Sequence, residues 1–163
     1  MSSYAIEAVA AQAGAALESL ERAIRACPDD VWGERPGQHV FGYMAFHTLF
    51  WHDFYLSPPQ AEFVPPPPYG FEEMDPAGVL PPRLYTKDEM LAYLEHGRAK
   101  LRAPFAALTD KRAALPCGFP GKELSVLELQ IYNLRHLQHH TAQLHLLMRQ
   151  AGHEPPRWVS RAP

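Results

Sequence analysis

The segment from Ser125 to Gly152 constrains the fold more than any other part of the chain, because no Pro or Gly interrupts it between its ends. Ser125 and Glu128, three residues apart, have the pattern of a capping box, in which two side chains satisfy backbone N–H groups at the start of a helix. Gly152 stands where many helices end in a left-handed residue. We therefore predict one long helix here, and the other segments must pack around it.

Four histidines lie on this predicted helix, but their spacing selects one pair. At about 100° per residue, His136 and His140 are within about 40° of each other on the arc that also holds Leu144, and we expect both rings to point into the core. His139 lies on the flank of the helix and His145 on its far side. Residues four apart have Cβ atoms roughly 5 to 6 Å apart, which lets two ring nitrogens approach one metal ion at about 2.0 to 2.1 Å.

Two interpretations of this pair are open. A histidine on an apolar face is more often a hydrogen-bonded core residue than a metal ligand, and a pair four apart arises by chance in a chain with nine histidines. Metal binding also needs a third ligand, which must come from another helix.

A second histidine helix is predicted over His39 to Leu56, where charges are few and aromatic residues dense. His47 shares one arc of this helix with Val40 and several aromatic residues, whereas His52 and Asp53 fall well away from it. We predict that His47 is the inward histidine of this helix. Because it lies near the middle of its helix, packing against the C-terminal helix can bring it to the depth of the histidine pair.

Two further segments have helical patterns. Apolar residues recur every three or four positions from Tyr4 to Ala26 and again from Thr86 to Leu108, where Thr86 and Glu89 form another capping-box pattern. Pro104 either kinks this helix or ends its regular part. The segments after residue 27 and after residue 108 are predicted to be connections, with Trp32 as a hydrophobic anchor in the first. The chain is thus all-α, with four long helices.

Residues 57–85 are rich in proline, which excludes a regular helix or a central strand. One reason for so long a segment is topological, because a chain that returns along a helix to start a parallel neighbour needs an extended crossover. Another is functional: aromatic residues of the segment, such as Phe63 and Tyr69, could fold it over an end of the bundle as a lid. A plain solvent loop is the alternative.

Length and charge limit the possible classes of protein. A chain of 163 residues with 47% hydrophobic content can bury one core, so we predict a single domain over residues 1–163. A formal net charge of −3 without a basic run gives no electrostatic footprint for nucleic acid or a membrane surface. No signal-peptide pattern and no long apolar window occur, so we expect a cytoplasmic protein. The two cysteines form no CxxC motif and suggest no redox role.

Two stretches resemble the DinB-like (YfiT-type) metalloprotein superfamily: VWGERPGQHVFGYMAFHTLFWHDFYL, with a Trp and an Arg-Pro pair before a histidine helix, and HLQHHTAQL. The resemblance covers nearly the whole chain and places the metal ligands of the superfamily on His47, His136 and His140. Thr141 and Ala142 stand where the superfamily has Arg and Gly. It implies an up-down-down-up four-helix bundle, often a homodimer, with a divalent metal such as Zn or Ni. In some relatives it implies transfer or isomerisation that depends on a low-molecular-weight thiol.

Three neutral histidines would leave a coordination position open, as catalytic metal sites do. Our first hypothesis is therefore a metal-dependent enzyme, either a thiol S-transferase or a hydrolase, acting on a small molecule beside the proline-rich segment. Candidates for the substrate pocket are Asn133, Gln143, Tyr43 and Trp51, with plain packing or hydrogen bonding to the ligands as the alternative.

No inward Asp, Glu or further histidine is evident as a general base, which disfavours hydrolysis. A second hypothesis is a non-catalytic bundle in which a metal staples the helices or senses a ligand. A third is a bundle without metal. Imidazole suits Zn, Ni, Cu and Fe alike, so the sequence does not choose the metal.

Overall fold

The structure is a computed structural model that describes residues 4–33, 41–59 and 62–162. Its elements are α1 (Tyr4–Ala26), α2 (Asp29–Trp32), α3 (Phe41–Leu56), the 3-10 helix η1 (Glu72–Met74), α4 (Lys87–Ala107), α5 (Asp110–Ala113) and α6 (Val126–Gln150). The described ranges contain no strand, so the all-α prediction is confirmed. Val40 and the Arg-Pro pair before α3 lie outside these ranges.

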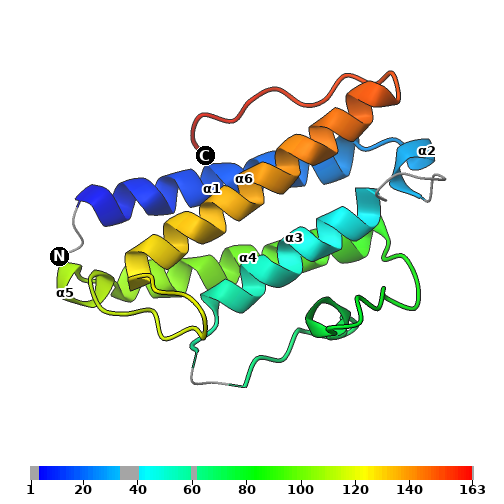
Figure 1. The fold of residues 1–163 in the computed structure, drawn as a ribbon. Helices are drawn as coiled ribbons and strands as arrows, with labels where there is room; N and C mark the ends of the chain where they lie inside the picture. The colour runs from blue at the N-terminus through cyan, green and yellow to red at the C-terminus, as the bar shows by residue number, and fades with distance from the viewer. Residues whose placement is uncertain (1–3, 34–40, 60–61, 163) are drawn as a thin grey trace.

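Four long helices lie side by side and form the body of the protein (Figure 1). Both α1 and α3 pack against α4 and α6. One hydrophobic cluster draws fully buried side chains from each of the four, among them Leu17, Phe46, Leu94 and Leu137. The core therefore lies along the common axis of the four helices, and the contact of α3 with α6 brings the two histidine-bearing helices together.

Local signals set the ends of these helices. Thr86 and Ser125 accept hydrogen bonds from the backbone N–H groups of Glu89 and Glu128, and both capping boxes are complete. Gly152 has a φ of +85°, a left-handed conformation that a residue without Cβ adopts readily.

Three smaller predictions about helices need revision or refinement. Helix α4 continues to Ala107, so Pro104 does not end it. The two predicted connections contain the short helices α2 and α5. Within α2, Trp32 is buried as expected, and its Nε1 donates to the carbonyl oxygen of Tyr85 at 3.0 Å.

The proline-rich segment packs on the bundle instead of extending into solvent. The Tyr69 ring stacks on the Tyr93 ring of α4 with a centroid separation of 4.1 Å and an interplanar angle of 10°. The Tyr85 ring lies 4.9 Å from the ring of Phe46 on α3. These contacts hold the segment along the side of α3 and α4, where it can reach side chains that face away from the central core.

The most buried side of α3 is not the side predicted. His52 and Asp53 are at most 1% exposed, whereas the side chain of His47 is 29% exposed. The interpretation of His47 as the inward histidine of α3 was therefore wrong, because His52 is the more deeply buried of the two. Apolar residues cover the whole circumference of α3, so a helical wheel cannot tell which arc meets the core. Gly97 on α4 leaves room for the His52 ring, since a Cβ at position 97 would lie 2.9 Å from His52 Cδ2.

Asp53 is the centre of a polar cluster between α3 and α4. Its carboxylate pairs with the Lys100 ammonium group, accepts from the Tyr93 hydroxyl at 3.1 Å and lies 3.3 Å from His96 Nε2. His96 is exposed at the surface, and its ring contacts this buried carboxylate from there. Burial of this aspartate is compensated by a cation and two further partners.

The C-terminal tail runs back along the bundle. Val159 is buried, and Gln12 Nε2 of α1 donates to the carbonyl oxygen of Ser160 at 3.2 Å. Trp158, on the same tail, is 72% exposed.

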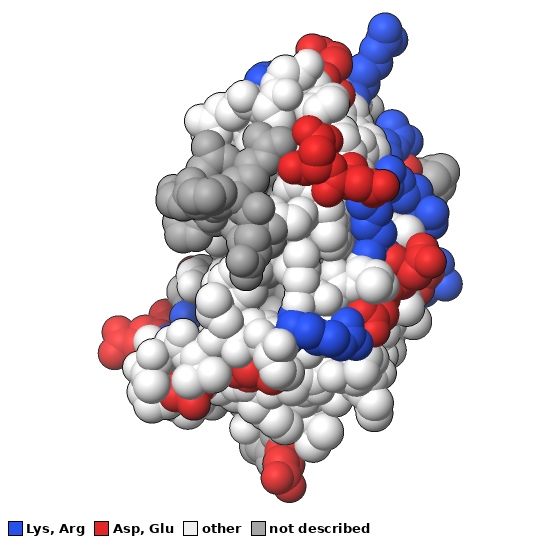
Figure 2. Space-filling model, turned by 90° about the vertical axis from the view of Figure 1, so that its right-hand side faces the viewer, with Lys and Arg blue, Asp and Glu red and all other residues white. Residues whose placement is uncertain are grey.

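The end of the bundle near α2 carries mixed charge. Figure 2 shows acidic and basic side chains interspersed along one side of this end, with uncharged surface between them. In the part of the chain that the structure describes, no helix is long and apolar enough to cross a membrane.

Candidate metal centre

Three imidazoles meet where α3 packs against α6. The ring of His47 lies 5.3 Å from that of His136 and 4.7 Å from that of His140, and the latter two rings are 4.4 Å apart. One nitrogen from each residue can be chosen so that all three lie within 4.8 Å of one another. The structure thus brings together the three histidines selected from the sequence, in a group that could hold a metal ion.

The spacing of two ring nitrogens fits a shared ligand. His136 Nε2 lies 3.4 Å from His47 Nε2. Two nitrogens bound to one tetrahedral metal ion at about 2.0 to 2.1 Å are separated by about 3.4 Å. The other nitrogen of His136, Nδ1, is buried and has no hydrogen-bond partner among the described residues. Donor chemistry and spacing therefore both suit a divalent cation.

The surroundings keep the rings of His136 and His140 neutral. Burial, reinforced by the neighbouring His140 and His47, lowers the pKa of His136 to about 3. Burial is also the main cause that lowers the pKa of His140, although a hydrogen bond to Gln143 acts against it. A neutral imidazole has the lone pair that metal binding requires, so no proton must be displaced from these two rings near neutral pH.

The centre lies at the edge of the α3–α6 contact and not in the middle of the core. The fully buried stripe of α6 passes through Leu137, Thr141 and Leu144, whereas His136 and His140 are partly exposed beside it. The prediction that these two rings point into the core was therefore wrong in depth, although their pairing was right. Partial exposure leaves an approach to the rings from outside the bundle.

A buried carboxylate from the proline-rich segment lies beside the centre. Glu73 Oε2 lies 2.6 Å from His47 Nδ1 and accepts from Trp51 Nε1 at 2.9 Å, and the Tyr43 hydroxyl interacts with the same carboxylate. The Glu73 side chain is only 4% exposed. Burial opposes its ionisation, but the hydrogen bonds from His47, Tyr43 and Trp51 prevail and lower its pKa.

Sequence reasoning found no inward acid as a general base and missed Glu73, a buried carboxylate beside His47. The acid comes from a segment without helical or strand periodicity, so no wheel could orient it. A signal was present on α3 nonetheless. Tyr43, His47 and Trp51 are spaced four apart, so their O–H and N–H groups line one stripe that needs an acceptor from elsewhere.

The four pocket candidates fall into three environments. Gln143 Oε1 lies 2.7 Å from His140 Nδ1, so it holds that ring, and Tyr43 and Trp51 contact Glu73. Asn133 is buried and engages a different histidine, with its Oδ1 3.1 Å from His52 Nδ1.

A surface groove of about 470 Å³ lies beside the centre on the outer side of α6. Its lining includes Tyr132, Arg135, His136 and His139. The Lys122 ammonium group sits 4.4 Å from the centroid of the Tyr132 ring. His136 thus borders both the histidine group and a groove large enough for a small molecule.

An all-helical protein with three convergent histidines is the class that this geometry defines. A sequence model of the DinB superfamily matches residues 12–144, a range that contains all three histidines and Glu73. The chain belongs to the DinB superfamily, whose members are often metal-dependent. No curated protein matches the chain.

Proposed function

We propose that His47, His136 and His140 bind one divalent metal ion and that the protein is a metal-dependent enzyme. The observation that carries this proposal is the 3.4 Å separation of His47 Nε2 and His136 Nε2, beside a third imidazole. His140 would bind through Nε2 as well, because its Nδ1 faces the acceptor oxygen of Gln143. Imidazole alone does not choose the metal, and we favour Zn or Ni because the resemblance described above implies one of them.

The donor set favours catalysis over a purely structural role. Structural zinc sites are closed by four protein ligands, whereas three histidines leave a position for substrate or water. The groove lined by His136 supports access to that position for a small-molecule substrate. Gln143 and Glu73 would hold two of the rings in place, while Tyr43 and Trp51 fix Glu73 itself.

Within this class we propose a thiol-dependent S-transferase over a hydrolase. A bound divalent cation would supply a Lewis acid that lowers the pKa of a coordinated thiol or water. Activation of water benefits from a general base, yet Glu73 is already engaged by His47 and Trp51. A low-molecular-weight thiol loses its proton more readily than water and needs no such base.

Metal analysis of protein purified without a histidine tag tests the metal centre. We expect one equivalent of metal per wild-type chain and a large loss in His136→Ala. His139→Ala is the matched control, because this exposed histidine lies on the same helix three residues away. Equal metal content in His136→Ala and wild type would contradict the proposed ligand set.

Cobalt substitution tests the open position and the thiol. Co²⁺-loaded protein titrated with glutathione should gain a sulfur-to-cobalt charge-transfer absorption. A non-catalytic staple with a closed site would show no such band, and its unfolding temperature would drop sharply with chelator.

We also infer the finer architecture and assembly. The helix pairs in contact and the course of the chain in Figure 1 support an up-down-down-up bundle, with residues 57–85 as the crossover and a single domain over residues 1–163. The resemblance described above supports a homodimer, which sedimentation velocity would test. A cytoplasmic location is the matching expectation, and cell fractionation would test it.

A further inference from the structure

We propose that Glu73 is a positioning residue of the metal centre, and that through it metal binding is coupled to docking of the proline-rich segment. The inference rests on the proposed metal site, and it concerns what holds His47 in a binding orientation. Of the three histidines, Glu73 hydrogen-bonds to His47 among the described residues and reaches His140 only through its charge, so its orienting effect would pass through His47.

The first step is the tautomer of His47. The ionised Glu73 carboxylate lies 2.6 Å from His47 Nδ1 and can only accept a hydrogen bond, so Nδ1 must carry the proton. The lone pair of the neutral ring then lies on Nε2, the atom that faces His136 Nε2 at 3.4 Å. Glu73 therefore selects the form of His47 that can bind a metal on the side where the other rings lie.

The second step is the rigidity of the carboxylate. Trp51 Nε1 donates to the same oxygen, Oε2, that contacts His47, and the Glu73 side chain is almost completely buried. Trp51 lies one helical turn after His47 on α3, so both donors come from a single rigid element. Carboxylates that accept from the outer nitrogen of a metal-binding histidine orient its ring and raise its basicity.

The third step is a contrast among the histidines. Gln143, the partner of His140, lies three residues away on the same helix and is neutral. Glu73, the partner of His47, is charged and belongs to η1 in a separate segment. A charge-assisted hydrogen bond is about twice as strong as a neutral one, so the larger orienting effect depends on where that segment lies.

The fourth step is the coupling. Aromatic contacts dock the segment: the Phe63 ring lies 5.4 Å from Phe50 and 5.3 Å from Phe54 on α3, and Tyr69 stacks on Tyr93. If docking of the segment strengthens metal binding through Glu73, metal binding must strengthen docking by the same factor. The segment that carries Glu73 should therefore become more protected when the metal binds.

Metal affinity provides the main test. Untagged protein is stripped of metal, and the Zn²⁺ dissociation constant is measured by competition with a chromophoric chelator. Glu73→Ala should weaken binding by about 10- to 100-fold, and Glu73→Gln, which keeps an acceptor oxygen, should recover part of the loss. Glu72→Ala is the matched control, because it removes a carboxylate from the same turn of η1 and should leave the constant unchanged.

Two further readouts separate positioning from general stability. The visible spectrum of the Co²⁺-loaded protein reports coordination geometry and should change in Glu73→Ala but not in Glu72→Ala. Hydrogen exchange in residues 62–86 should slow on Zn²⁺ binding in the wild type and respond less in Glu73→Ala.

The outcomes distinguish this inference from the proposed function. Wild type and Glu73→Ala with the same Zn²⁺ affinity would overturn the role of Glu73 and leave the three-histidine site standing. A wild-type protein that binds no metal would overturn both. Should Glu73→Ala fail to fold, as seen by circular dichroism, the isosteric Glu73→Gln provides the comparison with wild type.

Discussion

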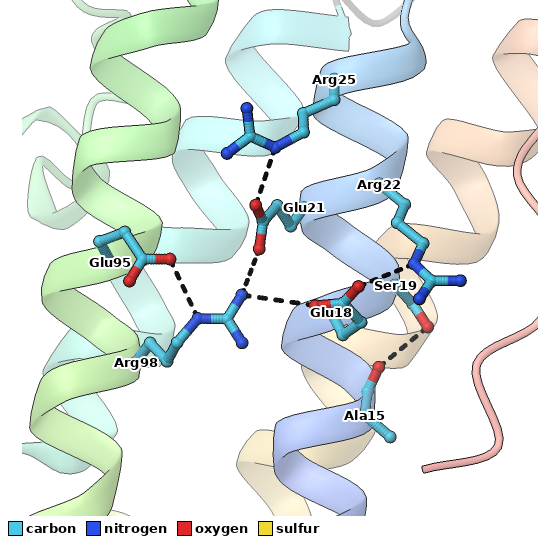
Figure 3. Close-up of polar contacts among 8 residues, drawn as sticks. All are labelled: Ala15, Glu18, Ser19, Glu21, Arg22, Arg25, Glu95 and Arg98. Carbon is cyan, nitrogen blue, oxygen red and sulfur yellow. Dashed lines mark hydrogen bonds and ion pairs between the residues drawn. The ribbon is translucent and has the colours of Figure 1, made fainter. Parts of the chain in front are cut away.

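Two helix contacts in this protein use ionisable side chains in different ways. Between α1 and α4, Arg98 pairs with Glu21 and lies 3.8 Å from Glu18, while its Nε also pairs with Glu95 of its own helix at 3.0 Å (Figure 3). These groups sit at the edge of the contact, with opposite charges side by side. Between α3 and α6, by contrast, three imidazoles face one another with their nitrogens pointing inward.

The difference in side-chain pairing bears on which of the two contacts could bind a ligand. Charged pairs near a surface contribute little net stability, usually about 0 to 1 kcal/mol, and they need no further partner. Clustered imidazoles lose hydration when they are buried together, and a shared metal ion would offset that loss. The α1–α4 contact is therefore complete in itself, whereas the three histidines of the α3–α6 contact could hold a metal ion.

The largest expected effect is the response of stability to metal. With free Zn²⁺ at about 1,000 times its dissociation constant, the free energy of unfolding should rise by about 4 kcal/mol. Thermal unfolding with and without Zn²⁺ measures the increase, which should vanish in His47→Ala. An equal increase in that variant would mean that the metal binds elsewhere.

Removal of the buried carboxylate between α3 and α4 should come next. Asp53→Ala leaves Lys100 without its anionic partner and the Tyr93 hydroxyl without an acceptor, so we expect a loss of about 3 kcal/mol. Urea unfolding would measure it. Asp53→Asn keeps the acceptor and should lose less, and a loss within about 0.5 kcal/mol for Asp53→Ala would disprove the role of this cluster.

Acidification should destabilise the metal-free protein through His52. Burial lowers the pKa of this fully buried ring to about 4, whereas in the unfolded chain it titrates near 6.5. The unfolded state therefore binds more protons between these values, so stability is complete above pH 6.5 and falls as the pH approaches 4. The contribution is at most about 3 kcal/mol.

Urea titrations at several pH values measure how the free energy of unfolding changes with pH. His52→Gln should make the dependence less steep, with the remainder due to groups such as His136, whereas His139→Ala, which changes an exposed residue, should leave it unchanged. An unchanged slope in His52→Gln would assign the acid sensitivity to other groups.

The smallest effect belongs to the α1–α4 contact. Arg98→Ala should reduce the free energy of unfolding by less than about 1 kcal/mol, and the difference should shrink at high salt because mobile ions screen these pairs. A loss comparable to that of Asp53→Ala would mean that the comparison between the two contacts is wrong.

Features encoded locally were predictable from the sequence, and features that depend on distant contacts were not. Thr86 with Glu89 and Ser125 with Glu128 act within one helical turn, so their capping boxes and the helix starts could be read directly. The histidine pair on α6 was equally local, since its spacing is a property of one helix. Its match with His47 needed only that two helices pack side by side.

How deeply each side chain is buried, and which residues from distant segments it contacts, could be learned only from the structure. The uniformly apolar surface of α3 concealed that His52, and not His47, faces the core. Glu73 was not predicted because its position depends on how an aperiodic segment docks. That docking is set by aromatic contacts between residues far apart in sequence. Helix periodicity finds residues on one element and cannot find the residue that another element brings to it.

The absent side chain at Gly97 has a consequence for how this protein can vary. A methyl group there would collide with the imidazole opposite it on α3, so the two helices can stay at their present spacing only while one position remains bare or the other shrinks. Substitutions at 52 and 97 should therefore be tolerated in compensating pairs.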